Sequence, residues 1–328
     1  MGRFFYLQVL KHLLLAILAW LGFAFIALPH LPASWAGNYI FLSLLSVPFV
    51  LVLAATCVAL FTTRFLSDWR WIFAILTLGG LGVLWNHVPT GTYTPSDPQS
   101  SIRLLSWNVT NFHIRPDTLH QAAAYIRNLN PDVICLQERP HENLISWDSI
   151  RAAFPEYPYA IRNEQREDEV LNLAILSKYP LDEARETYYA NTYNKTLSVE
   201  VNASKPFRLW NTHLQTTGHL PTHFIGNAKR RNAQADSLKL DVNRSQLPTI
   251  VCGDFNDTPC SYTYRRLEQG MQDAYRQASR QWTGSYQPLG SWLRIDYILC
   301  SKHWAVQSYE LLENPWSDHK MQFAILKN

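Results

Sequence analysis

Charged residues are scarce in this sequence: Asp, Glu, Lys and Arg make up 17% of its 328 residues, against about 25% in an average soluble protein. Cysteine is scarce too, with five residues and no close pair, which excludes a disulfide scaffold and a zinc ribbon. Neither sign of charge predominates, because the formal net charge is +3, so the overall charge does not indicate a nucleic-acid-binding protein. The 47% hydrophobic content excludes a disordered chain, and the length suits about two domains.

The shortage of charge is concentrated near the N-terminus, where no charged residue occurs between Lys11 and Arg64. Three long apolar runs occupy this region, and a helix needs about 20 apolar residues to cross a bilayer core of about 30 Å. We therefore expect residues 1–88 to form a membrane domain with three transmembrane helices, at about 5–28, 39–61 and 69–88. The alternative is that the three runs are buried helices of a soluble protein.

The few basic residues of this region predict its orientation. Arg3 and Lys11 lie at the start of the first run, and Arg64 and Arg70 lie between the second and third runs. Because basic residues favour the cytoplasmic side, we expect a multi-pass protein of the bacterial inner membrane, with everything after residue 88 on the non-cytoplasmic side. A signal-peptide cleavage site at 34–36 is an alternative fate for the first helix, and it leaves this placement unchanged.

The rest of the chain divides into a linker and a strand-rich domain. Residues 89–101 are rich in Pro, Ser and Thr and predict an extended linker. Residues 102–328 contain all but four of the 29 basic and all but two of the 26 acidic residues. Short apolar segments predict strands at 102–107, 133–136, 174–176, 197–201, 207–210, 249–252, 295–299 and 321–326, and helical periodicity predicts helices at 117–130 and 228–242. Many strands with few helices indicate packed sheets with helices outside.

Two groups of polar residues stand next to these strands. Asp254 and Asn256 follow one strand, and a carboxylate beside an amide can hold and deprotonate a water molecule, although an Asx turn explains the pattern equally well. Asp318 and His319 precede the last strand. A carboxylate and an imidazole can bind a metal or stabilise phosphate charge, although an ordinary loop is the simpler explanation for this pair alone.

Four further residues occupy similar positions. Asp296 begins a strand, and a half-buried carboxylate needs a partner, for which a histidine is one candidate. Glu138 ends an apolar strand and suits a hard cation. Asn108 and His213 also lie at or after strand ends. Together these six clusters are the arrangement expected when the loops of one domain converge on a single metal–phosphate site.

The order of short motifs gives these residues a family context. The segments are SWN at 106–108, DVICLQE at 132–138, NLAILSKYP at 172–180, NTHLQ at 211–215, CGDFND at 252–257, RIDYIL at 294–299 and SDH at 317–319. Their order and spacing resemble the endonuclease/exonuclease/phosphatase superfamily, which includes deoxyribonucleases, abasic-site endonucleases, neutral sphingomyelinases and inositol polyphosphate 5-phosphatases. The resemblance covers nearly all of 102–328. It implies an α/β fold, a four-layer αββα sandwich of two mainly antiparallel sheets flanked by helices.

The resemblance also implies a metal ion and a water-activating group. Glu138 resembles the principal Mg²⁺ ligand, with Asn108 and Asp318 assisting, and Mn²⁺ is the alternative ion. Asp254 resembles the base that activates the attacking water. Asn256 resembles the residue that orients this water or a phosphate oxygen.

The remaining residues resemble those that contact the phosphate. His319 would stabilise the charge that builds up in the transition state, Asp296 would orient and charge His319, and His213 resembles a second phosphate-contacting histidine.

The implied protein is a membrane-anchored, Mg²⁺-dependent phosphoesterase that hydrolyses phosphodiester bonds by metal-assisted attack of water, with an endonuclease as the leading candidate. A sphingomyelinase-like phospholipid phosphodiesterase, a phosphomonoesterase and an inactive tethered binding module are the alternatives. The expected partners are a phosphate-ester substrate, either nucleic acid or a phospholipid head group, and the bilayer through residues 1–88, with no obligate protein partner.

Two positions depart from the family pattern. Asn172 stands where many members have glycine, and asparagine tolerates the positive φ that a bend there would require. Some members pair the second histidine with a glutamate from the preceding segment, and Glu164, Glu167 and Glu169 are the candidates in this chain.

Other residues of suggestive type are assigned no role. His219 and His223 follow His213 at spacings of six and four residues, but Pro221 should break any helix between them, so no zinc site is expected. The basic residues at 229–231 are expected on a solvated helix face.

Overall fold

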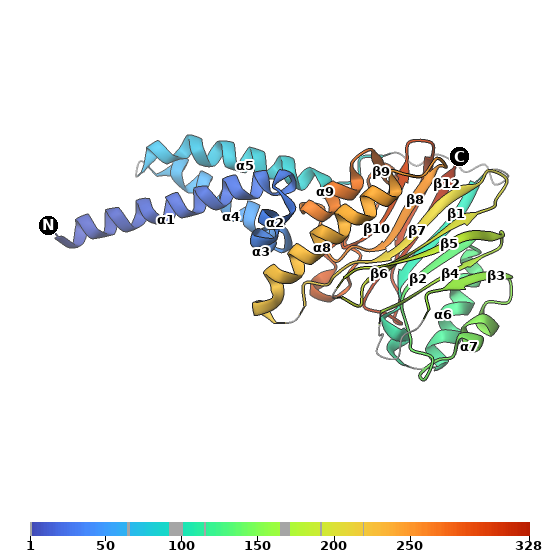
Figure 1. The fold of residues 1–328 in the computed structure, drawn as a ribbon. Helices are drawn as coiled ribbons and strands as arrows, with labels where there is room; N and C mark the ends of the chain where they lie inside the picture. Colours follow the sequence, from blue (N-terminus) through green and yellow to red (C-terminus); the bar gives the residue numbers. More distant parts are fainter. Residues whose placement is uncertain are drawn as a thin grey trace.

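The computed structural model describes residues 2–63, 66–91, 101–114, 116–164, 171–190, 192–218 and 220–328. A bundle of apolar N-terminal helices projects from one side of a β-sandwich, and the C-terminus lies on the sandwich far from the N-terminus (Figure 1).

The sandwich contains two six-stranded sheets. The first has the order β11-β12-β1-β2-β4-β3 and the second the order β5-β6-β7-β8-β10-β9. The strands of the first sheet are β1 (Ser101–Asn108), β2 (Val133–Arg139), β3 (Tyr159–Arg162), β4 (Asn172–Ser177), β11 (Ala305–Leu312) and β12 (Met321–Lys327). Those of the second are β5 (Leu181–Tyr188), β6 (Lys195–Val201), β7 (Phe207–His213), β8 (Thr249–Asp254), β9 (Met271–Asp273) and β10 (Asp296–Ser301). The pairs β1–β2 and β7–β8 are parallel and the other neighbours are antiparallel, so both sheets are mixed.

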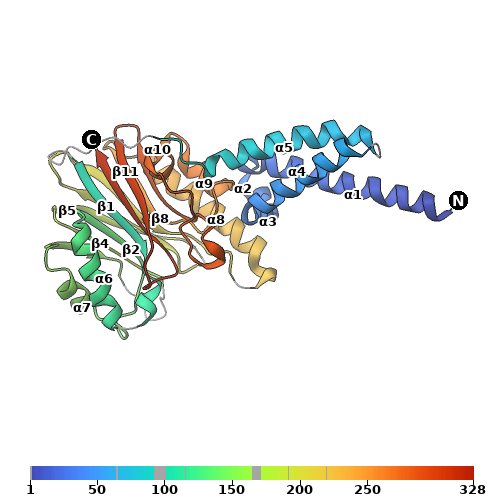
Figure 2. The ribbon, with the colours of Figure 1, turned by 180° about the vertical axis from the view of Figure 1, so that it is seen from behind.

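Helices cover both outer faces of the sandwich. The first sheet packs against α6 (Pro116–Leu129) and α7 (Trp147–Ala153), and the second packs against α8 (Pro221–Val242) and α9 (Tyr262–Glu268) (Figures 1 and 2). The short helix α10 (Ala274–Ala278) contacts β11. Alternate residues of each strand fill two different cores: Leu104 and Leu209 lie between the sheets, whereas Leu105 and Val251 face the helices. The predicted arrangement of two sheets flanked by helices is therefore confirmed, with one parallel pair in each sheet.

The N-terminal region consists of five α-helices within the described residues: α1 (Gly2–Ala27), α2 (Ala33–Ala36), α3 (Ile40–Leu44), α4 (Ser46–Thr62) and α5 (Arg70–Leu84). Among these residues one stretch, Phe5–His30, is helical, long and apolar enough to cross a membrane, and only 17% of its apolar window is buried. The second predicted run is broken, because its two halves, Ala33–Leu44 and Ser46–Thr62, meet at 73°. The third forms a helix of only 15 residues. The prediction of three transmembrane helices is therefore wrong: the structure has one candidate span, or two if the bent pair counts as one.

Two further expectations concern segments that are only partly described. Arg64, used to predict the orientation, lies outside the described residues, as do 92–100 of the predicted linker, so the orientation and the extended linker stay predictions. Just before that gap the chain is held on the sandwich, because the backbone amides of Thr90 and Gly91 donate to the carbonyl oxygen of Arg276 at 2.8 and 2.9 Å.

The helical region and the sandwich share an interface with buried polar contacts. The Ser43 hydroxyl on α3 donates to Asp257 Oδ1 at 2.9 Å and lies 2.7 Å from the Thr258 hydroxyl. The Asn232 amide on α8 donates to the carbonyl oxygen of Ala33 at 2.8 Å. Cys260 is buried among apolar side chains of the helical region. The segment 257–260, which follows the CGDFN motif, therefore packs directly against the N-terminal helices.

Helix α8 differs from its prediction in two ways. It begins at Pro221, seven residues earlier than expected, because proline is well tolerated in the first turn of a helix, where its missing N–H has no intrahelical role. His223 is exposed in that first turn, and His219 lies outside the described residues. Arg231, expected on a solvated face, is fully buried and paired with Asp257 at 2.9 Å.

Candidate active site

The candidate residues meet where strands of both sheets end, at the edge of the core between the sheets. Asn108 shares a strand face with Leu104, and Asp254 shares one with Cys252, both members of that core. His213 stands directly beside Asp254 in the parallel ladder of β7 and β8. The polar site is thus a continuation of the apolar core, and all three polar residues are buried.

A glycine makes the close approach of β7 and β8 possible. Gly253 has a φ of +130°, and a Cβ at this position would lie 2.0 Å from the carbonyl oxygen of Thr212. Any other residue would push apart the two strand ends that carry His213 and Asp254. The glycine of the CGDFND motif is therefore needed for the geometry of the site.

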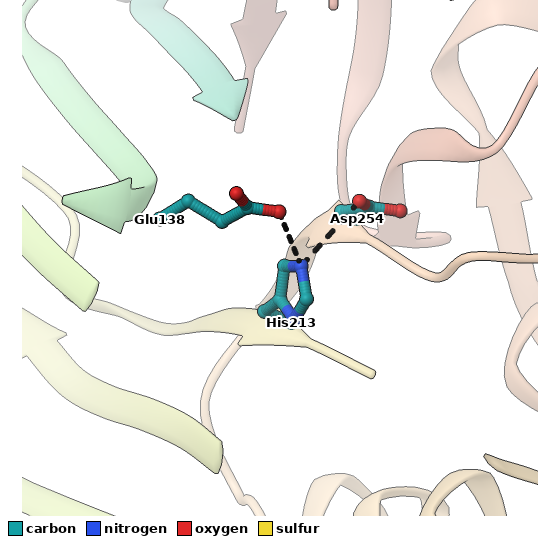
Figure 3. Close-up of side chains that lie close together, drawn as sticks. All are labelled: Glu138, His213 and Asp254. Carbon is teal, nitrogen blue, oxygen red and sulfur yellow. Dashed lines mark hydrogen bonds and ion pairs between the residues drawn. The ribbon is translucent and has the colours of Figure 1, made fainter. Parts of the chain in front are cut away.

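Glu138 reaches the site through a distorted backbone. Simple alternation would place its side chain with Ile134 and Leu136, which face the helices. The pairing of β2 with β4 is irregular between Leu136 and Arg139, and Glu138 has a φ of +51°, a conformation that is costly for a non-glycine residue. This bulge turns the carboxylate toward His213, as Figure 3 shows.

The first group of side chains contains Glu138, His213 and Asp254 (Figure 3). His213 Nε2 lies 3.0 Å from Glu138 Oε1 and 3.6 Å from Asp254 Oδ2. The Asn108 amide donates to Glu138 Oε1 at 2.9 Å and to Asp254 Oδ2 at 3.1 Å. Burial opposes the charge of Glu138, but the hydrogen bonds from His213 and Asn108 lower its pKa to about 2. Burial would likewise lower the pKa of His213, but Glu138 and Asp254 raise it.

The second group contains Asp254, Asp296 and His319. His319 Nδ1 lies 2.9 Å from Asp296 Oδ2, and Nε2 lies 3.9 Å from Asp254 Oδ2. Burial disfavours the imidazolium, but Asp296, Asp254 and Asp318 together raise the pKa of His319 to about 10. Burial and the charge of Asp296 raise the pKa of Asp254 to about 6. Asp254 therefore belongs to both groups and joins them.

Asn256 and Asp318 lie at the border of these groups. The backbone N–H of Asn256 donates to Asp254 Oδ1 at 2.7 Å, and its side-chain amide donates to the carbonyl oxygen of Leu214 at 3.0 Å. Asp318 accepts a hydrogen bond from the Thr110 hydroxyl, and its Oδ1 lies 3.9 Å from His319 Nε2. The structure thus brings all eight predicted site residues together, with Asp318 on the His319 side rather than beside Glu138.

The residue that orients His213 is one that the sequence did not suggest. The side-chain nitrogen of Asn194 lies 3.0 Å from His213 Nδ1 and donates to the His213 carbonyl oxygen at 3.2 Å. Of the three glutamates considered for this position, Glu164 is exposed, and Glu167 and Glu169 lie outside the described residues. Asn194 immediately precedes β6, where its neighbour Lys195 pairs with His213 in the ladder, and only this long-range pairing identifies it.

The positive φ considered for Asn172 is found at another residue. Asn172 is the first residue of β4 and pairs with Arg139 opposite the β2 bulge. The positive φ falls on Glu138 instead. Asn172 is fully buried, and its carbonyl side-chain oxygen accepts a hydrogen bond from Asn163 at 3.1 Å.

The sequence matches the model of the endonuclease/exonuclease/phosphatase family over residues 105–319. The chain belongs to this family. All eight residues of the candidate site lie within the matched region, and the N-terminal helices lie outside it. A comparison with curated proteins finds no match.

Solved structures share the family fold. A family member from Bacteroides vulgatus has 20% identity and a TM-score of 0.57, with 70% of this chain and 99% of that chain covered. The TDP2 structure from C. elegans has 18% identity and a TM-score of 0.56 over 70% and 75% of the two chains. The human Nocturnin catalytic domain, solved with a bound sulfate anion, has 19% identity and a TM-score of 0.55 over 70% and 93%. At these identities the likeness concerns the fold.

The residues of the site fit a divalent cation of the kind typical of this family. In each group one ligand atom per residue lies within 4.8 Å of the others, and most of these residues are buried. Carboxylate oxygens are the preferred ligands of Mg²⁺ and Mn²⁺. The raised pKa of Asp254 reflects burial and a second nearby carboxylate, and a cation at this point would relieve both effects.

Proposed function

We propose that this chain is a membrane-anchored, divalent-metal-dependent phosphoesterase that hydrolyses phosphodiester bonds. The observation that carries the proposal is the convergence of Glu138 and His213 in one group, and of Asp296 and His319 in a second, with Asp254 shared by both. Family membership supports hydrolysis of a phosphoester bond, since this is the chemistry of endonucleases, exonucleases and phosphatases. The metal, the anchor and the role of each residue are part of the proposal.

Two residues would prepare the attacking water. Asp254 would accept its proton, and the burial and the charge of Asp296, which raise its pKa to about 6 in the absence of a metal, favour its role as a base. Asn256, fixed by its hydrogen bonds to Asp254 and Leu214, would orient the water or a phosphate oxygen. Because the water and its base would be held side by side, the proton transfer would not require the two groups to meet by diffusion.

The two histidines would stabilise the phosphate. His319 carries a positive charge held by Asp296 and points Nε2 toward the site, where it would donate to a phosphate oxygen as negative charge builds up. His213, positioned by Asn194, would donate a second hydrogen bond. Glu138, with Asn108 beside it, would hold Mg²⁺, with Mn²⁺ as the alternative, and Asp318 would assist from the His319 side. The bound ion would supply Lewis-acid neutralisation of phosphate oxygens.

The N-terminal helix would be the membrane anchor. The stretch Phe5–His30 is long enough for a bilayer and leaves large apolar side chains such as Leu13, Ile17 and Phe23 about half exposed to the surroundings. A core helix of a soluble protein would bury them instead. We therefore propose that α1 crosses the membrane. We place the sandwich on the non-cytoplasmic side, since Arg3 and Lys11 lie at the end of α1 remote from it.

The anchor also bears on the substrate. A phosphate ester presented at a membrane, such as a phospholipid head group, suits an anchored enzyme, whereas the family description includes nucleases. Purified full-length protein in detergent should therefore be tested with Mg²⁺ or Mn²⁺ on plasmid DNA, on phospholipid and sphingomyelin vesicles, and on a chromogenic phosphodiester. Activity on one class identifies the substrate, and no hydrolysis of any of them would contradict the proposal.

The same assay tests the site. Glu138→Gln and His319→Ala should each reduce the rate about 10²- to 10³-fold, because each removes one charge-stabilising group. Excess chelator should abolish the activity, and added Mg²⁺ should restore it. Glu164→Gln, an exposed change in the neighbouring segment, is the control and should leave the rate unchanged. Wild-type rates in the Glu138 and His319 variants would show that the reaction takes place elsewhere.

A further inference from the structure

The first turns of α8 expose apolar side chains that the sandwich does not cover. Leu220, just before the helix, is 59% exposed, and Ile225 is 41% exposed. Phe224 lies between them in the sequence. A soluble domain rarely leaves such side chains clustered at one helix end unless another surface covers them.

This end of α8 lies on the side from which the N-terminal helices project (Figures 1 and 2). The rings of Phe224 and Phe41, on α3, have their centroids 5.4 Å apart. Close packing continues one turn later, because a Cβ on Gly37 would lie 2.6 Å from Lys229 Cγ. The tip of α8 is therefore fixed beside the α2–α3 segment, where the sandwich meets the bundle.

Exposed apolar side chains also occur on the part of the bundle that lies beside α8. Phe41 and Leu45 on the α3–α4 segment are 47% and 48% exposed, and Trp20 on α1 contacts Tyr39, just before α3, with ring centroids 5.8 Å apart. Beyond the apolar turn, α8 continues with Lys229 and the exposed Arg230. An apolar tip followed by basic residues is typical of a helix that rests in a membrane interface with anionic head groups.

We propose that the first turns of α8, with Leu220, Phe224 and Ile225, form a second membrane contact that inserts into the interface of the bilayer crossed by α1. This inference rests on the membrane anchor of the proposed function. The occupant of the exposed α8 surface is the lipid bilayer, since that surface is linked to the exposed Trp20 of α1 through the ring contacts of Phe224 with Phe41 and of Tyr39 with Trp20, and basic residues follow it on α8.

The contact limits how far the candidate site can lie from the lipid head groups. His213 and Leu220 are seven residues apart, and such a segment spans at most about 25 Å when fully extended. It is held in place by the Arg231 guanidinium, which donates to the carbonyl oxygen of Gln215 at 2.8 Å, and by Asn227, which donates to that of Thr217 at 3.0 Å. Because these hydrogen bonds join α8 to the residues that follow His213, the depth of α8 in the bilayer would also determine how far His213 lies from the lipid head groups.

A depth measurement on the full chain tests the contact. Four of the five cysteines are buried and Cys57 is partly exposed, so Cys57→Ser gives a background for single nitroxide labels. Labels at Ile225→Cys and Leu220→Cys probe the tip of α8. Leu240→Cys, on the same helix and 56% exposed, is the matched control, about 22 Å farther along the helix. Ile17→Cys on α1 reports on the anchor itself.

The host is a nanodisc of equal parts phosphatidylcholine and phosphatidylglycerol, and the readout is the accessibility of each label to oxygen and to a water-soluble nickel relaxant.

The outcomes separate the two proposals. Labels at 225 and 220 should have an oxygen-to-nickel accessibility ratio several-fold higher than the label at 240, and the ratio at 17 should be the highest. Equal ratios at 225, 220 and 240, with a high ratio at 17, would overturn the α8 contact and leave the anchor standing. A low ratio at 17 would overturn the anchor and with it the α8 contact.

Discussion

The buried pair of His319 and Asp296 shows how one short contact determines the chemistry of a residue. The ring of His319 is almost fully buried, which favours its neutral form. Asp296 at 2.9 Å favours the charged form, and its effect on the pKa outweighs that of burial. The pair also has neighbours that hold it in place, because the His319 carbonyl oxygen accepts hydrogen bonds from Trp107 and Asn314. The histidine is therefore charged before any phosphate arrives.

This charge predicts a pH dependence of stability in the metal-free protein. The pKa of His319 rises from 6.5 to about 10 on folding, so its stabilising contribution is complete below pH 6.5 and is lost as the pH rises toward 10. The free energy of unfolding of the wild type, measured in chelator, should exceed that of His319→Asn at pH 6.5, and the difference should shrink toward pH 10. Asp296→Asn should reduce this pH dependence. A difference that stays constant or grows with pH would contradict the charged state of His319.

Residue types and spacing, together with the family resemblance, predict which residues meet at the candidate site but not its supporting contacts. Asn108, His213, Asp254 and Asp296 stand at strand ends, where alternation places them on one face, and the structure brings them together. The inward turn of Glu138 depends on a bulge and a positive φ, which no residue type in DVICLQE specifies. Asn194 contacts His213 only because β6 pairs with β7, a long-range contact that one sequence does not reveal.

At the scale of elements, α8 joins the helical region, the catalytic strand β8 and the segment after it. Arg231 on α8 is fully buried, and its guanidinium binds Asp257 Oδ2 through two nitrogens at 3.1 and 2.9 Å. Asp257 also accepts a hydrogen bond from Ser43 on α3. A sequence pattern of three consecutive basic residues suggests a solvated face, and only the packing reveals that one of the three is the centre of a buried contact.

This ion pair predicts a contrast between neighbouring arginines. Arg231→Met should reduce the free energy of unfolding by about 3–5 kcal/mol, because it leaves the buried carboxylate of Asp257 without its partner. Arg230→Met, one residue earlier and exposed, should change it by about 0.5 kcal/mol or less. Denaturant titration of the full chain in detergent measures both. Similar small losses in the two variants would mean that the Asp257 contact contributes little.

At the scale of the whole molecule, the site joins the two sheets. Glu138 and Asn108 come from the first sheet, whereas His213, Asp254 and Asp296 come from the second. Just beneath them, Gln137 donates to Asn211 across the sandwich at 2.7 Å. A cation at Glu138 would also lie close to Asp254 of the other sheet, and its charge would offset the repulsion between the carboxylates that the two sheets bring together.

Metal binding should accordingly stabilise the entire fold. Mg²⁺ at a hundred times its dissociation constant should raise the free energy of unfolding by about 2.7 kcal/mol, because the ion binds only the folded state. The melting temperature of the wild type should rise with Mg²⁺ and fall with chelator, and Glu138→Gln should lose most of this response. An equal response in both proteins would indicate that the ion binds elsewhere.

The two-sheet fold could be predicted from the sequence because its strands are short, apolar and bounded by polar residues. The number of helices long enough to cross a membrane could not be predicted, since hydropathy counts apolar residues but does not detect the 73° break between Leu44 and Ser46. Nor did composition predict that Ser43 and Asn232 would join the helices to the sandwich. These contacts depend on which surfaces meet, not on local pattern.

The interface between the bundle and the sandwich has a practical consequence for biochemistry. A fragment trimmed to residues 101–328 would strip Cys260 of its apolar cover and Asp257 and Thr258 of their bonds to Ser43. Such a fragment should aggregate more readily and hold the segment after Asp254 less firmly, so a failed assay on it would be uninformative. A negative result is informative when the assay uses the full chain solubilised in detergent.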